Sequence, residues 1–130
     1  MSIIPSLAAG LVQLQALATF LDIGSENATF IFYDDEKPAS VNITADPAAK
    51  LATLTFPKPC FKQLNADGIE LNQTDAALVT KSGTAVWARI YNGNGDAVAD
   101  FSVGSEITLA NPELALGSIL MINSFVLEPS

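Results

Sequence analysis

The C-terminal half of the chain alternates runs of β-branched and aromatic residues with short breaks rich in Gly and Asn. Residues 83–91 place aliphatic side chains at every second position, and Asn-Gly-Asn-Gly-Asp at 92–96 separates this run from the next, at 97–103. Successive side chains of a strand point to opposite faces, and Asn-Gly pairs favour the tight turns of hairpins. The pattern therefore predicts a mainly β fold of antiparallel strands, for which we expect a jelly-roll-like β-sandwich.

A single helix is expected ahead of the strands, at residues 5–23. Asp22 is the only charged residue in this stretch. Its apolar stripe has the three-and-four spacing of an amphipathic helix, and it consists of Leu7, Leu11, Leu14, Ala18 and Leu21. A helix so poor in charge should be nearly enclosed, either by its own sheet or by a neighbouring chain.

The whole chain, residues 1–130, is expected to fold as one domain, and its sandwich is expected to occupy about 28–128. Alternation, proline positions and turn residues predict strands at 28–33, 51–56 and 107–109, a short edge strand at 39–44, and a hairpin within 61–72. Residues 75–81 are compatible with either strand or loop.

The last strand, within residues 118–127, carries apolar side chains on both faces. Leu120 and Ile122 point one way, whereas Met121 and Phe125 point the other. Such a pattern is typical of a strand that is buried on both sides. We therefore expect it beneath the helix or at a subunit contact.

The composition favours association with other protein chains and disfavours nucleic acid. Hydrophobic residues make up 49% of the chain and charged residues only 15%. Large exposed apolar patches usually mark interaction sites, so we expect a homo-oligomer. The net charge of −8 would repel a phosphate backbone.

Several kinds of chemistry are excluded by what the sequence lacks. It has no histidine, which excludes Ser-His-Asp and Cys-His catalysis and histidine zinc sites. The single cysteine, Cys60, is expected to be a small core residue. No apolar run reaches membrane-spanning length, and a secretory signal is not expected because the N-terminal stretch has no basic region. We predict no cofactor and no metal.

Trp87, Arg89 and Tyr91 share one face of a predicted strand and admit two interpretations. Their side chains could form a platform on which a sugar stacks. Alternatively, Trp87 is a core anchor and Arg89 pairs with Asp100 on the adjoining strand, an arrangement favoured by the frequent use of buried Trp in β-sandwiches.

Two acidic or amide clusters also have a structural and a chemical interpretation. Asn92, Asn94 and Asp96 resemble part of a calcium loop, but Val103 occupies the place of the bidentate Glu, so a hairpin turn is favoured. The acids at 34–36 share one solvated loop, whereas a hydrolase needs two carboxyl groups in different environments. We therefore predict a protein that is not an enzyme.

The order of segments resembles a family of small structural proteins of tailed bacteriophages and prophages. A Gly-Thr-Ala-x-Trp-x-Arg-Ile motif is matched by Gly83-Thr-Ala-Val-Trp-Ala-Arg-Ile90, and a Gly-x-Ala-Val-x-Asp-x-Ser-Val-Gly motif by Gly95-Asp-Ala-Val-Ala-Asp-Phe-Ser-Val-Gly104. Weaker matches lie at 29–33, 51–61 and 117–127. The chain departs from the family at Phe101, where Gly is common, and in a longer acidic loop at 34–47.

The resemblance implies a virion component that is assembled in the host bacterial cytoplasm. Its partners would be its own copies and other capsid, neck or tail proteins, as for a capsid decoration (cement) or head-tail accessory protein. The alternative is a carbohydrate-binding or adhesin module of a phage tail or cell surface. The residues expected to make the contacts are Leu7, Leu11, Leu14, Trp87, Arg89, Tyr91, Met121 and Phe125.

Overall fold

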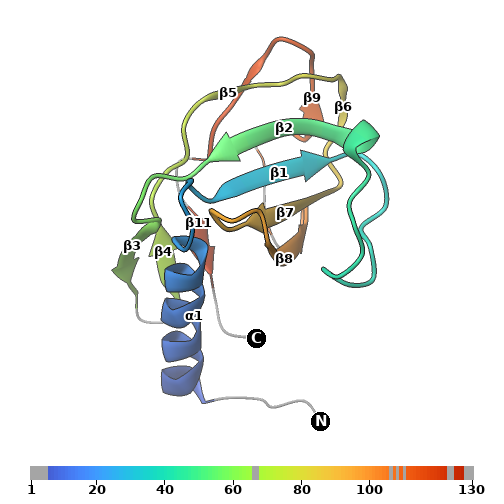
Figure 1. Cartoon of the computed structure of the whole chain (residues 1–130). Coiled ribbons are helices and arrows are strands. Elements are labelled where there is room, and N and C mark those ends of the chain that lie inside the picture. Colours follow the sequence, from blue (N-terminus) through green and yellow to red (C-terminus); the bar gives the residue numbers. More distant parts are fainter. Residues whose placement is uncertain are drawn as a thin grey trace.

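The chain is mainly β with one N-terminal α-helix, as the sequence predicts, in a computed structural model that describes residues 6–65, 68–105, 107, 109, 111–122 and 125–127 (Figure 1). The elements are α1 (Leu7–Leu21), β1 (Thr29–Tyr33), the short 3-10 helix η1 (Pro47–Ala49), β2 (Lys50–Thr55), β3 (Phe61–Leu64), β4 (Ile69–Leu71), β5 (Ala77–Leu78), β6 (Gly83–Thr84), β7 (Trp87–Tyr91), β8 (Ala97–Ser102), β9 (Glu113–Leu114), β10 (Ile119–Leu120) and β11 (Phe125–Leu127).

The largest sheet has four strands in the order β2-β1-β7-β8. β1 lies between two antiparallel neighbours, with Phe30 opposite Leu54 of β2 and Ile90 of β7. β7 pairs in turn with β8, which places Arg89 opposite Asp100. This β7–β8 hairpin is the one that the alternating sequence pattern predicts.

The two faces of this sheet are covered by different groups. One face carries the main apolar core. In this core the ring centroid of Phe30 lies 4.9 Å from that of Phe32 and 6.1 Å from that of Phe56. The other face carries Tyr33 and Trp87 and is covered by residues of the loop between β1 and β2. The alternation expected for residues 28–33 is confirmed.

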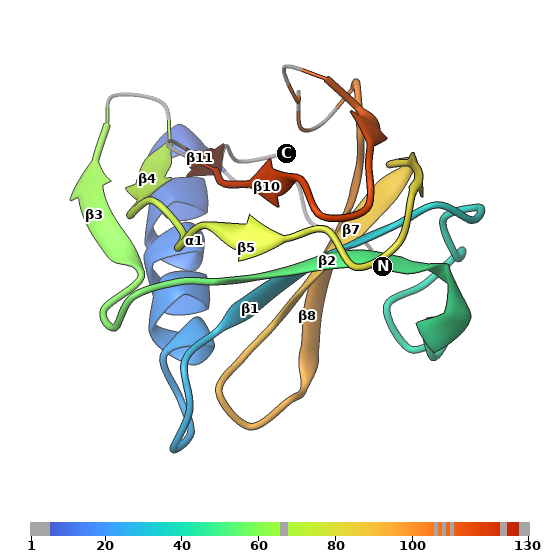
Figure 2. The same ribbon diagram turned by 90° about the horizontal axis from the view of Figure 1, so that it is seen from above.

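α1 lies against the second sheet, whose strands are ordered β11-β4-β3 (Figures 1 and 2). The Ser6 hydroxyl caps the helix by accepting a hydrogen bond from the Ala9 N–H at 3.2 Å. Ala18 and Leu21 are buried against the core. The far side of the helix is exposed, so enclosure by the chain's own sheet is wrong, and coverage by a neighbouring chain stays a prediction.

The end of α1 is attached to the start of β3 through Cys60. The Cys60 N–H donates to the Asp22 carboxylate at 3.1 Å, and the Cys60 thiol donates to the Ala18 carbonyl at 3.5 Å. Cys60 is fully buried, which confirms its expected place in the core. Burial raises the pKa of the Cys60 thiol to about 12, and the neighbouring Asp22 adds to the shift.

Two predicted strands are wrong. Residues 39–44 form turns because the carbonyls of Ser40 and Ile43 bend inward to accept hydrogen bonds from Arg89. Of the strand expected at 107–109, residue 108 lies outside the described part of the chain; Ile107 makes an isolated bridge to Val103, Leu109 is in no strand, and the next strand is β9 at Glu113–Leu114. Residues 75–81, whose sequence is compatible with either strand or loop, contain the short strand β5.

The last predicted strand is also wrong as a single element. It is divided into β10, which pairs with β5, and β11, which pairs with β4. Between the two, Ile122 exchanges hydrogen bonds with Thr74, so the segment passes from one sheet to another. Ile119 is 65% exposed and Met121 is 39% exposed, and therefore β10 is not buried on both sides.

The turn between β7 and β8 packs closely on the loop that follows α1, and this contact makes a testable prediction. A Cβ on Gly93 would overlap the Glu26 carbonyl oxygen and lie 2.7 Å from that of Ile23. We expect Gly93→Ala to lower the free energy of unfolding by about 3 kcal/mol, since backbone on both sides must move. Chemical denaturation measures the change.

Gly95→Ala is the matched control in the same turn. Gly95 has φ of 85° but open space around its Cβ position, so only the left-handed backbone strain of about 1 kcal/mol is expected. Equal losses for the two variants would contradict the close packing at Gly93.

Candidate functional site

Trp87 lies inside the molecule, between the four-stranded sheet and the loop at 34–46. Its exposed fraction is 0%, and its ring stacks on that of Tyr33 with centroids 4.4 Å apart. The indole N–H donates to the Asp35 carboxylate at 2.7 Å. The polar edge of the ring is therefore satisfied by the loop, and its faces are used for packing.

Arg89 lies next to Trp87 and holds the same loop in place. Its guanidinium binds Asp100 through two hydrogen bonds, Nε to Oδ1 at 2.6 Å and Nη2 to Oδ2 at 3.0 Å. Nη1 also donates to the Ile43 carbonyl at 2.7 Å. The side chains of Arg89 and Asp100 are only 2% and 8% exposed, and the hydrogen bonds that Asp100 accepts raise the pKa of Arg89. The predicted Arg89–Asp100 pair is confirmed.

The prediction that Trp87 and Arg89 make surface contacts is therefore wrong, because both side chains are buried. Their burial also removes what the sugar-stacking interpretation requires, which is a tryptophan ring open to solvent. Tyr91 is half-buried, and its hydroxyl lies 2.9 Å from that of Tyr33. Burial is the main cause that raises the pKa of the Tyr33 hydroxyl, and the hydrogen bond with Tyr91 adds to the shift.

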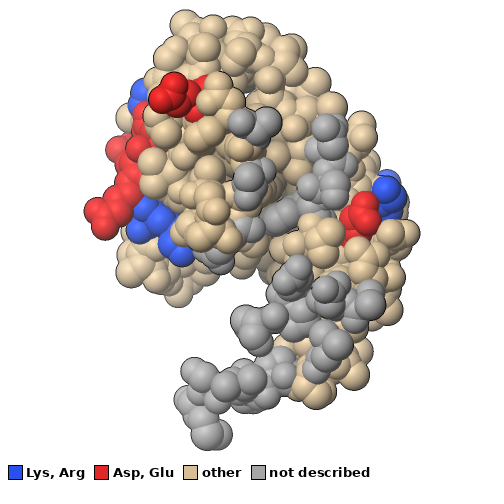
Figure 3. Space-filling view, turned by 180° about the vertical axis from the view of Figure 1, so that it is seen from behind, with Lys and Arg blue, Asp and Glu red and all other residues tan. Residues whose placement is uncertain are grey.

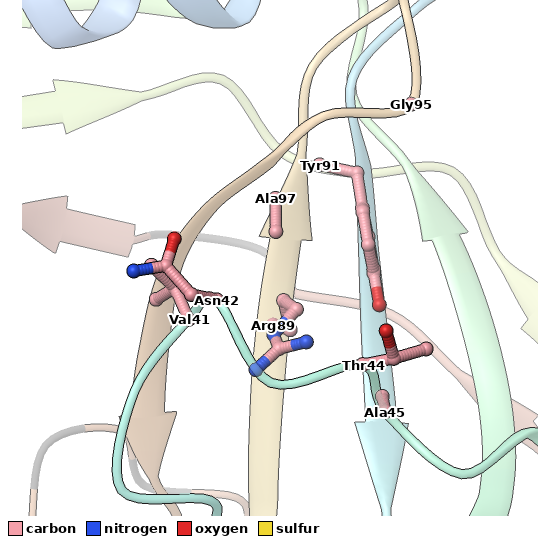
Figure 4. Close-up of a pocket in the computed structure, with 8 residues that line it drawn as sticks. All are labelled: Val41, Asn42, Thr44, Ala45, Arg89, Tyr91, Gly95 and Ala97. Atoms are coloured by element: carbon pink, nitrogen blue, oxygen red, sulfur yellow. The ribbon is translucent and has the colours of Figure 1, made fainter.

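A cavity of about 250 Å³ opens beside this layer (Figure 4). The loop at 41–45 forms one wall, and Arg89, Tyr91 and Ala97 form the floor. Pockets that bind drug-sized ligands have volumes of about 300–1,000 Å³. Because Asp100 and loop carbonyls already engage the guanidinium, a bound anion would have to displace these partners. The cavity can therefore hold at most a small polar group.

The two clusters considered for metal or acid chemistry have structural partners. The Asn92 side-chain oxygen accepts hydrogen bonds from the N–H groups of Asn94 and Asp96, both at 3.0 Å, which confirms a hairpin turn. Asp34 binds Lys81 at 2.9 Å and Asp35 binds Trp87. Within the part of the chain that the structure describes, no three acidic or thiol groups are placed to hold a metal ion.

Large apolar side chains stand on the surface at the β5–β10 pair. Leu78 and Ile119 are register partners on this pair, and they are 59% and 65% exposed. Met121, two residues after Ile119, is 39% exposed, whereas Ile122 is buried. Leu78, Ile119 and Met121 thus form an apolar surface, the hairpin patch. Of its members, only Met121 was predicted as a contact residue.

The outer side of α1 forms a second apolar surface. Val12 is 64% exposed and Phe20 is 41% exposed. Leu14 instead packs against the core, and Leu11 is half-buried, so these two predicted contact residues belong mainly to the inner face. The predicted contacts of Leu7 and Phe125 fall on side chains outside the described part of the structure.

Charged residues are sparse on the described surface. In Figure 3, which shows the face opposite to that of Figure 1, Lys, Arg, Asp and Glu gather toward two margins, and the described surface between them is uncharged. In the ion pairs Lys62–Glu70 and Lys81–Asp34, the lysine is exposed and the acid is half-buried. Hydrogen bonding to Lys62 lowers the pKa of Glu70.

Comparison of the chain with family models, with curated proteins and with solved structures gives no match in any of the three. The described part of the chain also contains no helix with the length and apolarity needed to cross a bilayer.

Proposed function

We propose that this protein is a non-enzymatic structural component of a bacteriophage virion, acting as a capsid decoration protein or as a head-tail or neck accessory protein. The resemblance described above supports the virion assignment. The arrangement of the exposed apolar residues supports a role in binding other protein chains.

The motif block that carries the resemblance, residues 83–104, contains the β7–β8 hairpin at one edge of the largest sheet. Trp87 and Arg89 of this block fasten the neighbouring loop through Asp35 and the Ile43 carbonyl. Such residues give a scaffold its shape and offer little for chemistry. These structural roles of Trp87 and Arg89 are consistent with the prediction that the protein is not an enzyme.

The hairpin patch is the single observation that carries the proposal. Three neighbouring large apolar side chains are between 39% and 65% exposed on a protein that has few surface charges. Each Å² removed from water contributes roughly 25 cal/mol before the costs of association. Burial of this patch against another virion protein would therefore supply affinity without any ligand or cofactor.

Incorporation into particles tests the proposal. Particles are purified on a density gradient from cells that supply the protein, and the chain is quantified by mass spectrometry. We expect wild-type protein to migrate with particles in a fixed number of copies. Leu78→Glu combined with Ile119→Glu should reduce incorporation at least tenfold, because it places charge at a buried contact.

Thr53→Glu is the matched control, since Thr53 is exposed on β2 and outside the hairpin patch. It should be incorporated normally. Wild-type protein that stays at the top of the gradient, separate from the particles, would contradict the proposed function.

A further inference from the structure

The outer side of α1 carries a continuous strip of uncharged residues. Successive helix residues are about 100° apart, so Ala9, Val12, Ala16 and Phe20 fall within an arc of about 80°. All four are exposed. We call them the helix stripe. The opposite side of α1 holds Ala18 and Leu21 against the protein's own core, and the helix stripe is left without a partner in the described structure.

The charge distribution identifies which partner can cover the helix stripe. The protein has a net charge of −8, so two copies repel each other across most pairs of faces. α1, however, contains no Asp, Glu, Lys or Arg in its 15 residues. Asp22, the first acid after the helix, accepts a hydrogen bond from Cys60. The helix stripe is thus a face on which identical copies can meet without bringing their negative charges together.

The order of side-chain sizes along the helix stripe fits an antiparallel pair of helices. A twofold axis near residue 14 places Val12 of one copy opposite Ala16 of the second copy, and Phe20 beside Ala9, the small residue at the other end of the helix stripe. Each large side chain then meets a small one, which is how ridges of one helix fill the grooves of another. A contact of this kind is self-complementary, as a twofold interface requires.

We propose that α1 is a self-association element that pairs antiparallel with α1 of a second copy through the helix stripe. The inference rests on the proposed function for its biological role, and it leaves the hairpin patch to a different virion protein. A helix of 15 residues is about 22 Å long. One such contact covers less than the roughly 800 Å² per partner of a standard interface, so the dimer should be weak and dependent on concentration.

Sedimentation velocity over a concentration series tests the proposal. Wild-type protein should shift from monomer to dimer as its concentration rises. Val12→Glu should weaken the dimer at least tenfold, because it adds acid to both sides of the contact. Leu78→Glu, the matched control at an equally exposed position on the hairpin patch, should dimerise like wild type.

Disulfide trapping tests the orientation of the helices. A mixture of Val12→Cys and Ala16→Cys proteins should form mixed disulfide dimers well in excess of dimers of either protein alone. Cys60 is buried and does not compete. A parallel pair would give the opposite ratio, and no trapping together with a monomeric wild type would overturn the proposal.

The two proposals fail in distinguishable ways. A wild-type protein that is monomeric at every concentration but migrates with particles leaves the proposed function intact and overturns pairing through α1. A protein that dimerises through the helix stripe but is absent from particles does the reverse. Loss of dimerisation in Leu78→Glu and its retention in Val12→Glu would assign self-association to the hairpin patch, against the inference.

Discussion

Asp100→Ala is expected to lower the free energy of unfolding by about 3–5 kcal/mol, since it leaves the Arg89 guanidinium buried without its carboxylate. The two side chains are 2% and 8% exposed, so little solvent reaches the guanidinium to replace the lost carboxylate. The two remaining carbonyl contacts of Arg89, from Ile43 and Ser40, are neutral. Urea denaturation followed by tryptophan fluorescence gives the value.

The double variant Arg89→Met with Asp100→Leu separates loss of the pair from burial of a lone charge. Replacement of both partners by apolar residues of similar volume is often close to neutral. We expect the double variant to recover most of the stability that Asp100→Ala loses. A loss below about 1 kcal/mol for Asp100→Ala would show that the pair is open to solvent, contrary to the structure.

Trp87→Ala is expected to cost about 3–5 kcal/mol as well, because it leaves a large cavity under the loop. The ring is fully buried and stacks on Tyr33, and its N–H is bound to Asp35. Thermal unfolding followed by circular dichroism measures the loss. Trp87→Phe, the matched variant, keeps the aromatic contact but lacks the hydrogen bond, and it should lose considerably less.

The Trp87 variants also separate the structural role from sugar binding. A carbohydrate-binding site on this residue would lose binding in Trp87→Ala while stability stayed unchanged. A fully stable Trp87→Ala protein would therefore contradict the buried anchor described here.

The parts of the fold that the sequence predicts correctly are those set by local signals. The β7–β8 hairpin follows from strict alternation on either side of an Asn-Gly turn, and α1 follows from its apolar spacing. The Arg89–Asp100 pair was also predictable, because adjoining strands of a hairpin place such residues opposite each other. In these cases the interacting residues lie close together in the chain.

The errors arise where distant residues decide the structure. The segment is split into β10 and β11 because Ile122 is hydrogen-bonded to Thr74, 48 positions away. The alternation of residues within the segment does not predict this distant contact. The segment at 39–44 has a strand-like pattern, but its carbonyls bind Arg89, which lies 46 positions beyond Ile43. The hydrogen bond from Trp87 to Asp35, which joins residues 52 positions apart, is not predicted by the sequence for the same reason.

Exposure was the least predictable property of the candidate contact surfaces. The sequence predicts a contact role for Met121 but not for Leu78. An apolar residue in a short segment is normally assigned to the core, and only the pairing of β5 with β10 shows that Leu78 is exposed. The sequence did indicate that α1 is too poor in charge for a free surface helix. Which side of the helix stays uncovered depends on how it packs on β3 and β4.

Oxidation of Met121 in free and particle-bound protein tests the central claim, that exposed apolar surfaces of this chain are covered by neighbouring virion proteins. Met121 is 39% exposed, so dilute hydrogen peroxide should convert it to the sulfoxide readily in the isolated protein. Mass spectrometry of peroxide-treated, purified particles should detect the chain with Met121 largely unoxidised. Equal oxidation of Met121 in both states, or absence of the chain from the particles, would contradict the account.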